Sequence, residues 1–112
     1  MTGLHQNQID HFNQRGYLVV EDLLDDVTLS AVRREYAGLM DRLYEGWVAD
    51  GLVPPAHGGM SFWDKLSHCY GGGFDWYQPF DISLPHNDIT EQTPMHFGPA
   101  VFDMVTNARI LD

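Results

Sequence analysis

Three side chains in this sequence are of the types that hold a catalytic iron ion. His86 and Asp88 are separated by one residue, and His96 follows eight residues after Asp88. An H-x-D pair and a third, distant histidine can bind iron(II) on one side and leave coordination positions open for reactants. Here His96 lies close by in sequence, and the triplet follows Pro85 with the turn-forming Asn87 at its centre. We therefore expect Asp88 to cap a turn, and a small metalloenzyme using His86, Asp88 and His96 stays an alternative.

Signatures of other chemistries are missing from the sequence. The remaining histidines show no metal-ligand spacing, and neither H-E-x-x-H nor C-x-x-C occurs, so zinc is not indicated. The glycine runs 58–59 and 71–73 are not followed by the lysine and hydroxyl residue of a phosphate-binding loop. No G-x-S-x-G nucleophile elbow occurs either. Cys69 has only His68 as a neighbouring cation, so we expect a buried, unreactive thiol.

The chain is strongly acidic. It has 16 Asp and Glu against 6 Lys and Arg, and its formal net charge is −10 at pH 7. Binding to nucleic acid or to an anionic membrane needs clustered cations, and only Arg33 and Arg34 are adjacent here. We therefore expect neither partner. With one cysteine and no apolar run long enough for a signal sequence or a membrane span, we expect a reduced, cytoplasmic protein.

Two helices separated by a short extended run are predicted for the first half. Ile9 and Phe12 predict a helix over about 6–15 that ends at Gly16, and the β-prone residues 17–20 predict a strand. Asp25 predicts the start of a long helix over about 25–50. Its apolar side chains recur every three or four residues, at Leu29, Val32, Tyr36, Leu39, Met40, Leu43 and Trp47. Its polar side is expected to face solvent and carries Arg33, Arg34, Glu35, Asp41 and Arg42.

The second half is predicted to be rich in loops, because residues 51–99 hold all 6 prolines. Ser61 and Asp64 predict one short helix that ends at the glycine run 71–73. Pro99 predicts a helix over about 99–106, and Asn107 predicts the start of a further helix over 107–112 that needs a continuation to be stable. We expect one aromatic cluster to pack on the long helix, although it could also line a pocket or dock on a second domain; it comprises Phe74, Trp76, Tyr77 and Phe80. Residues 1–112 thus form one domain at most, mainly α with one or two short strands and long loops.

A series of short motifs fills the first third of the chain. Residues 9–20 read Ile-Asp-His-Phe-Asn-Gln-Arg-Gly-Tyr-Leu-Val-Val, residues 22–24 read Asp-Leu-Leu, and the capped helix follows from Asp25. This order resembles the beginning of the phytanoyl-CoA dioxygenase family, whose members open with a helix, a Gly-Tyr or Gly-Phe step, a short β run and a Leu-Leu step into a capped helix. Residues 106–112 resemble the stretch that leads into the core domain of that family.

The resemblance implies a parent enzyme with a double-stranded β-helix (jelly-roll) core. Such an enzyme binds iron(II) and 2-oxoglutarate and hydroxylates a small organic or acyl substrate with dioxygen. In the family, the metal triad and the arginine that binds 2-oxoglutarate follow a segment like this one, so no residue here is assigned to them. We expect a helical lead-in without a catalytic core or cofactor of its own, inactive alone, whose partner is the remainder of the same jelly-roll domain. The other alternative is a stand-alone helical module that binds a protein through Trp47, Trp63 and Trp76.

Overall fold

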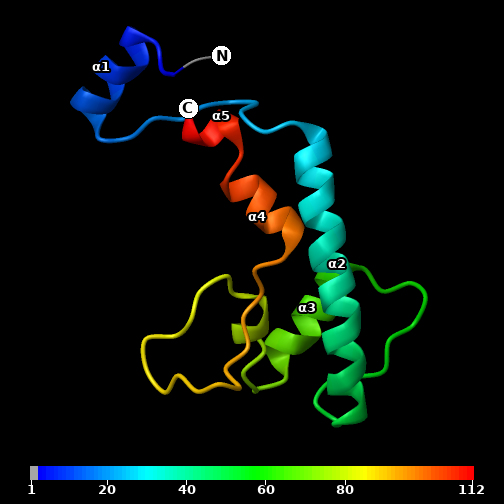
Figure 1. The fold of residues 1–112 in the computed structure, drawn as a ribbon. Helices are drawn as coiled ribbons and strands as arrows, with labels where there is room; N and C mark the ends of the chain where they lie inside the picture. The colour runs from blue at the N-terminus through cyan, green and yellow to red at the C-terminus, as the bar shows by residue number, and fades with distance from the viewer. Residues whose placement is uncertain (1–2) are drawn as a thin grey trace.

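The computed structural model of the chain describes residues 3–112, in which helices are joined by long irregular segments (Figure 1). In chain order the elements are α1 (Gln6–Arg15), α2 (Asp26–Ala49), α3 (Phe62–Gly71), the 3-10 turn η1 (Gln78–Phe80), α4 (Pro99–Val105) and α5 (Ala108–Leu111). The mainly helical class expected from the sequence is therefore present. The 3-10 turn η1 was not predicted.

The helices begin and end at residues whose side chains or backbone angles favour those positions. Asp25 accepts a hydrogen bond from the backbone N–H of Thr28 at 2.9 Å, which satisfies one of the free donors at the start of α2. Gly16 ends α1 in the left-handed conformation with φ 78°, which a residue without Cβ adopts at no steric cost. Pro99 occupies the first turn of α4, where its missing N–H loses no hydrogen bond.

The strand predicted over residues 17–20 is wrong: within residues 3–112 the structure has no strand. These residues form an irregular connector after α1, where the rings of His11 and Tyr17 meet edge to face at 5.2 Å. A strand needs a neighbouring strand to pair its N–H and C=O groups, and the described part of the chain provides none. The Val19 side chain is accordingly 72 % exposed.

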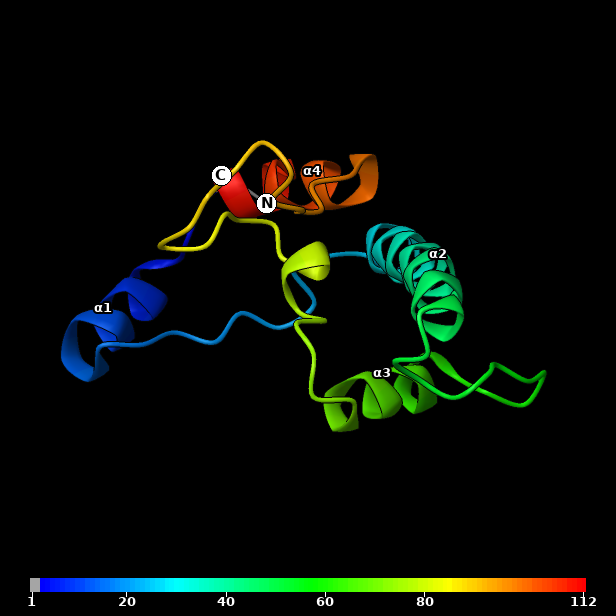
Figure 2. The ribbon, with the colours of Figure 1, turned by 90° about the horizontal axis from the view of Figure 1, so that it is seen from below.

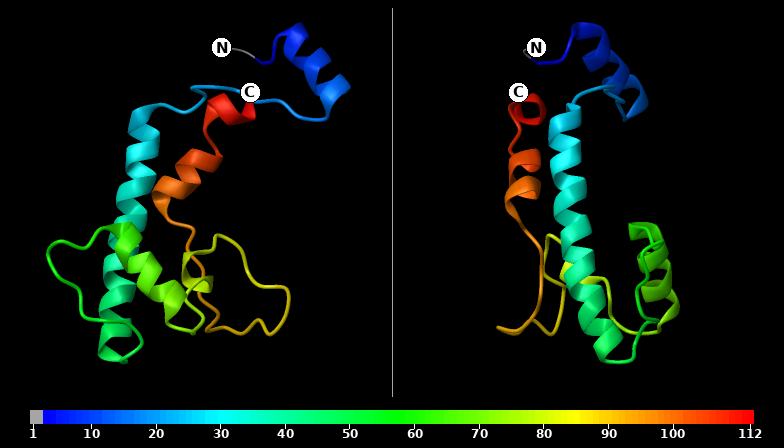
Figure 3. Two further views of the ribbon diagram at one scale, coloured as in Figure 1. Left: turned by 180° about the vertical axis from the view of Figure 1, so that it is seen from behind. Right: turned by 90° about the vertical axis from the view of Figure 1, so that its right-hand side faces the viewer.

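The core lies where α2 meets α3 and the loops that follow both helices. Its buried centre consists of Met40, Tyr44, Val53 and Cys69. Tyr44 on α2 is only 1 % exposed. The apolar positions predicted for this helix did not include it. Figures 2 and 3 show α3 and α4 on different sides of α2, which makes α2 the central element of the fold.

The aromatic cluster after α3 packs against α2 for the most part. The ring of Trp47 on α2 lies 5.1 Å from that of Phe74 and 6.2 Å from that of Phe80, measured between centroids. Trp76 also contacts Phe80, at 6.4 Å. Tyr77 is 58 % exposed, although its ring meets that of Trp76 edge to face at 5.9 Å. The packing interpretation therefore holds for Phe74, Trp76 and Phe80.

The fold is open for a chain of this length. Its radius of gyration is 18.3 Å and its extents are 55 × 36 × 26 Å, whereas a compact domain of this length has a radius of about 13 Å. Helix α1 lies apart from the α2–α3 core, at the end where the chain also reaches α5 (Figure 1). In the part of the chain that the structure describes, no helix is both long and apolar enough to cross a bilayer.

Candidate functional site

The structure does not bring the three candidate iron ligands together. His86 and Asp88 are exposed in the loop before α4, where Asp88 adopts a left-handed backbone with φ 60°. His96 lies instead against α2, with its ring centroid 5.3 Å from that of Tyr36. Among residues 3–112, no group of three or more His, Cys, Asp or Glu side chains is placed to hold a metal ion. An iron(II) site does not fit these residues, so we assign none of them as a ligand.

His96 belongs to a different arrangement, in which the Glu35 carboxylate of α2 holds the start of α4. Glu35 Oε1 accepts a hydrogen bond from the backbone N–H of Ala100 at 3.0 Å, and Oε2 accepts one from Val101 at 3.1 Å. Both N–H groups belong to the first turn of α4 and have no partner within that helix. The side chain of Glu35 is only 14 % exposed, so the expectation that this residue faces solvent is wrong.

The electrostatics of Glu35 follow from these contacts. Burial acts to raise the pKa of the Glu35 carboxyl, but the hydrogen bond from Ala100, the contact with His96 and the hydrogen bond from Val101 lower it by more. The net pKa is below the ordinary value of 4.5. His96 Nε2 is 3.2 Å from Glu35 Oε2, yet this buried nitrogen has no aligned hydrogen bond within residues 3–112. The contact is close enough for an ion pair with a protonated imidazole.

Gly98 allows the backbone to approach this carboxylate. A Cβ atom added to Gly98 would lie 2.6 Å from Glu35 Cδ and 2.8 Å from His96 Nε2, and closer still to Glu35 Oε1. Real Cβ atoms are not found at such distances. The tip of a glutamate side chain can usually move aside, but here movement would break its hydrogen bonds to α4. Glycine is therefore required at position 98 because a side chain would not fit beside Glu35. Its φ of −79° does not require glycine.

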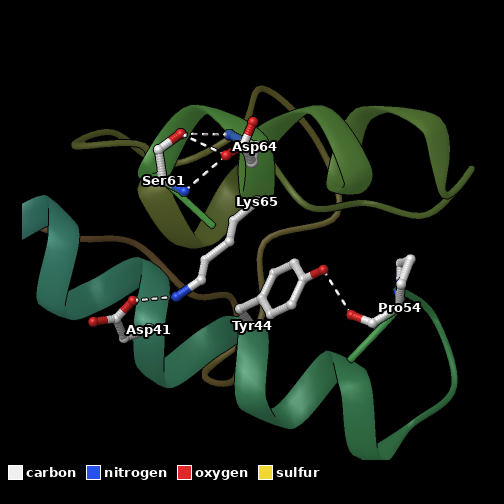
Figure 4. A network of polar contacts seen from close by, with 6 residues as sticks. All are labelled: Asp41, Tyr44, Pro54, Ser61, Asp64 and Lys65. Carbon is white, nitrogen blue, oxygen red and sulfur yellow. Dashed lines mark hydrogen bonds and ion pairs between the residues drawn. The ribbon is translucent and has the colours of Figure 1, made fainter. Parts of the chain in front are cut away.

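Polar contacts also fix α3 against α2 (Figure 4). Lys65 Nζ lies 2.6 Å from Asp41 Oδ1 and 5.7 Å above the centroid of the Tyr44 ring. The Tyr44 hydroxyl donates to the carbonyl of Pro54 at 2.7 Å, and burial raises the pKa of this hydroxyl. Asp41 is 67 % exposed, so its pair with Lys65 contributes little to stability. The buried Tyr44 ring joins α2 to α3 through the core that it shares with Cys69, and its hydroxyl fixes the loop between the two helices at Pro54.

Cys69 is the buried thiol that the sequence predicts. Its side chain is 0 % exposed within the core at the α2–α3 contact. Burial raises the pKa of the Cys69 thiol, which keeps it protonated and unreactive.

An apolar groove remains open between α2 and α3. Its volume is about 490 Å³, and it is lined by Val32, Arg33, Tyr36, Ala37, Phe62 and Trp63. Sequence reasoning did not identify this groove. The available signal was Trp63, which follows Phe62 directly and so cannot share the core-facing side of α3 with Phe62 and Leu66.

The three tryptophans have different environments. Trp47 and Trp76 are partly buried and pack against the core, whereas Trp63 is 70 % exposed. A protein-binding surface that uses all three would need the first two to leave the core. Trp63 is thus the one tryptophan of the three whose side chain is mostly exposed.

Comparisons with protein-family models, with curated proteins and with solved structures each find no match to this chain.

Proposed function

We propose that residues 1–112 are the helical front part of an iron(II)/2-oxoglutarate oxygenase of the phytanoyl-CoA dioxygenase type. In this proposal the segment itself carries no iron ligand. It packs against the jelly-roll core that binds iron(II) and 2-oxoglutarate, and it helps to wall the entrance for a small organic or acyl substrate. The sequence resemblance over residues 9–25 supports the family, and the apolar surface of the fold supports the packing role.

The observation that carries the proposal is the large surface left open. The structure exposes 8290 Å², whereas a compact monomer of this mass exposes about 6,200 Å². The excess of about 2,000 Å² is as large as the area buried in many permanent interfaces. A fold that packs against a further domain accounts for an excess of this size.

Of the 18 large apolar side chains that are exposed in the described residues, nine lie at one end of the fold. This end consists of residues 3–24, which include α1 and its connector, and residues 97–112, which include α4 and α5; the ribbon shows α5 close to the connector (Figure 1). We call it the α1–α5 end. Its side chains that are at least 38 % exposed are Leu4, Ile9, Phe12, Tyr17, Val19, Phe97, Phe102, Ile110 and Leu111. Burying one such side chain stabilises a structure by about 1.5–3 kcal/mol, so this end is the natural contact for the proposed core.

Comparison of the 112-residue chain with the complete polypeptide tests the packing role. The coding sequence beyond codon 112 is read first and should encode an H-x-D pair and a distant histidine. In the complete polypeptide, Leu111→Asp should lower the unfolding midpoint and reduce 2-oxoglutarate turnover, because a charge would enter the contact with the core. In the 112-residue chain the same change should be neutral, since Leu111 is 68 % exposed there.

Leu84→Asp serves as the matched control. Leu84 is 48 % exposed but lies in the loop before α4, outside the α1–α5 end. Leu84→Asp should leave the unfolding midpoint unchanged in both polypeptides and the turnover unchanged in the complete one. Equal effects of the two changes in the complete polypeptide, or a following sequence without a metal triad, would contradict the proposal. Slow, cooperative hydrogen exchange of α1 and α5 in the 112-residue chain would do so as well, because those helices would then need no partner.

A further inference from the structure

The groove between α2 and α3 has the size of a small-molecule site. Its volume of about 490 Å³ falls within the range of about 300–1,000 Å³ that is usual for ligand pockets. A protein partner would instead cover about 800 Å² on each side, which is more than six lining residues provide. The dimensions therefore favour a small ligand.

The walls of the groove are fixed by the core behind them. Tyr36 is held by the hydrogen bond of its hydroxyl to the carbonyl of Phe80 at 3.0 Å. On α3, Phe62 packs against the core and supports Trp63, whose ring meets it edge to face at 5.1 Å. Tyr36 and Phe62 are thus held in place before a ligand binds, whereas Trp63 is 70 % exposed and is ordered in part by the ligand. The three aromatic walls of the groove suit a flat aromatic ring, which can stack or pack edge to face.

The charge of the groove comes from Arg33 alone. Of the six lining residues, Arg33 is the one that carries a charge, and it forms no ion pair within residues 3–112. A single cation beside apolar walls complements a single negative charge. Phosphate, with nearly two charges, would remain poorly compensated on a chain whose net charge is −10.

We propose that this groove binds a small aromatic carboxylate, with its ring between Tyr36, Phe62 and Trp63 and its carboxylate on the Arg33 guanidinium. This site does not depend on the function proposed above, because it is built wholly from α2 and α3. It lies away from the α1–α5 end, so both surfaces could be occupied at once.

A pair of matched probes tests the site on the 112-residue chain. Naphthalene-2-carboxylate and the neutral naphthalene-2-carboxamide are titrated separately, and the indole N–H signal of Trp63 is followed by NMR, assigned with Trp63→Phe. We expect the carboxylate to bind about fivefold more tightly than the amide at low salt, as for an exposed ion pair. This preference should fall at high salt. Both probes should shift the Trp63 signal at lower probe concentrations than the signals of Trp47 and Trp76.

Variants of two adjacent arginines separate the site from general charge. Arg33→Gln should remove the preference for the carboxylate. Arg34→Gln should keep it, because this variant loses the same charge at a position outside the groove. Trp63→Ala should lower the affinity for both probes by about fivefold, because one aromatic wall is lost. Circular dichroism should show equal helix content in both arginine variants, since both side chains are exposed.

Several results would overturn the proposal. These are absence of binding, equal binding of the two probes, or equal effects of the two arginine changes. Movement of the Trp63 signal with protein concentration alone would show that a second copy of the chain occupies the groove, which also overturns it. Failure of these tests would leave the proposed packing role untouched, since Leu111→Asp probes a different surface.

Discussion

Replacing Glu35 with alanine should release α4 from α2. The change removes the acceptor for the N–H groups of Ala100 and Val101, which lie 3.0 and 3.1 Å from the carboxylate oxygens. Each such hydrogen bond contributes about 0.5–1.5 kcal/mol net, and loss of a helix cap costs about 0.5–2 kcal/mol. We therefore expect the docking of α4 to weaken by about 2 kcal/mol.

Hydrogen exchange measured by NMR reports this loss locally. If exchange proceeds through opening of α4, about 2 kcal/mol corresponds to roughly thirtyfold faster exchange of the amides at 103–105. Glu35→Gln should give a smaller increase, because the amide oxygen can still accept one hydrogen bond. Glu45→Ala is the control: it removes the same charge from the same helix, but Glu45 lies on the exposed side. Equal exchange rates in Glu35→Ala and Glu45→Ala would refute the capping role of Glu35.

Three further predictions concern the same junction and the start of α3. Because the pKa of Glu35 is depressed in the fold, its contribution is complete above the ordinary value of 4.5 and is lost as the pH falls through the lower folded value. The difference in unfolding free energy between the natural chain and Glu35→Gln, from urea titrations, should therefore shrink on acidification, and a difference that grows would contradict this sign. Gly98→Ala should destabilise α4 in the natural chain but less in Glu35→Ala, because two of the three short contacts of an added Cβ are with that carboxylate and the third, with His96, remains; a double-mutant cycle in urea measures the coupling, and additive effects would show that the carboxylate does not restrict this position. Ser61→Ala should reduce stability by about 1 kcal/mol through loss of the α3 cap at 3.1 Å to the N–H of Asp64, whereas the exposed Ser67→Ala should be nearly neutral in thermal melts. Equal melting shifts for the two serine changes would speak against the cap.

Local chemistry made the helices predictable. Asp25, Ser61 and Asn107 each accept a backbone hydrogen bond from a residue two or three positions further along, so the signal and its consequence lie in the same short stretch. Gly16 and Pro99 act in the same local way through backbone geometry. These residues gave helix ends close to those in the structure.

The errors concern contacts between distant parts of the chain. Residues 17–20 have β-prone side chains, but a strand also needs a partner that composition does not reveal. Glu35 was assigned to the solvated side of α2 because periodicity describes one helix at a time. Its partners Ala100 and Val101 are 65 and 66 residues away in sequence. The groove beside Trp63 likewise requires two helices whose crossing the sequence does not specify.

The fit between Gly98 and Glu35 restricts how this junction can change in evolution. A larger residue at position 98 becomes acceptable once the carboxylate at position 35 is shortened or lost and the His96 side chain moves aside, and α4 then needs another cap. Substitutions at the two positions should therefore covary in homologous sequences, although 63 positions separate them in the chain. That covariation would identify related chains that share this junction even where the rest of the sequence has diverged.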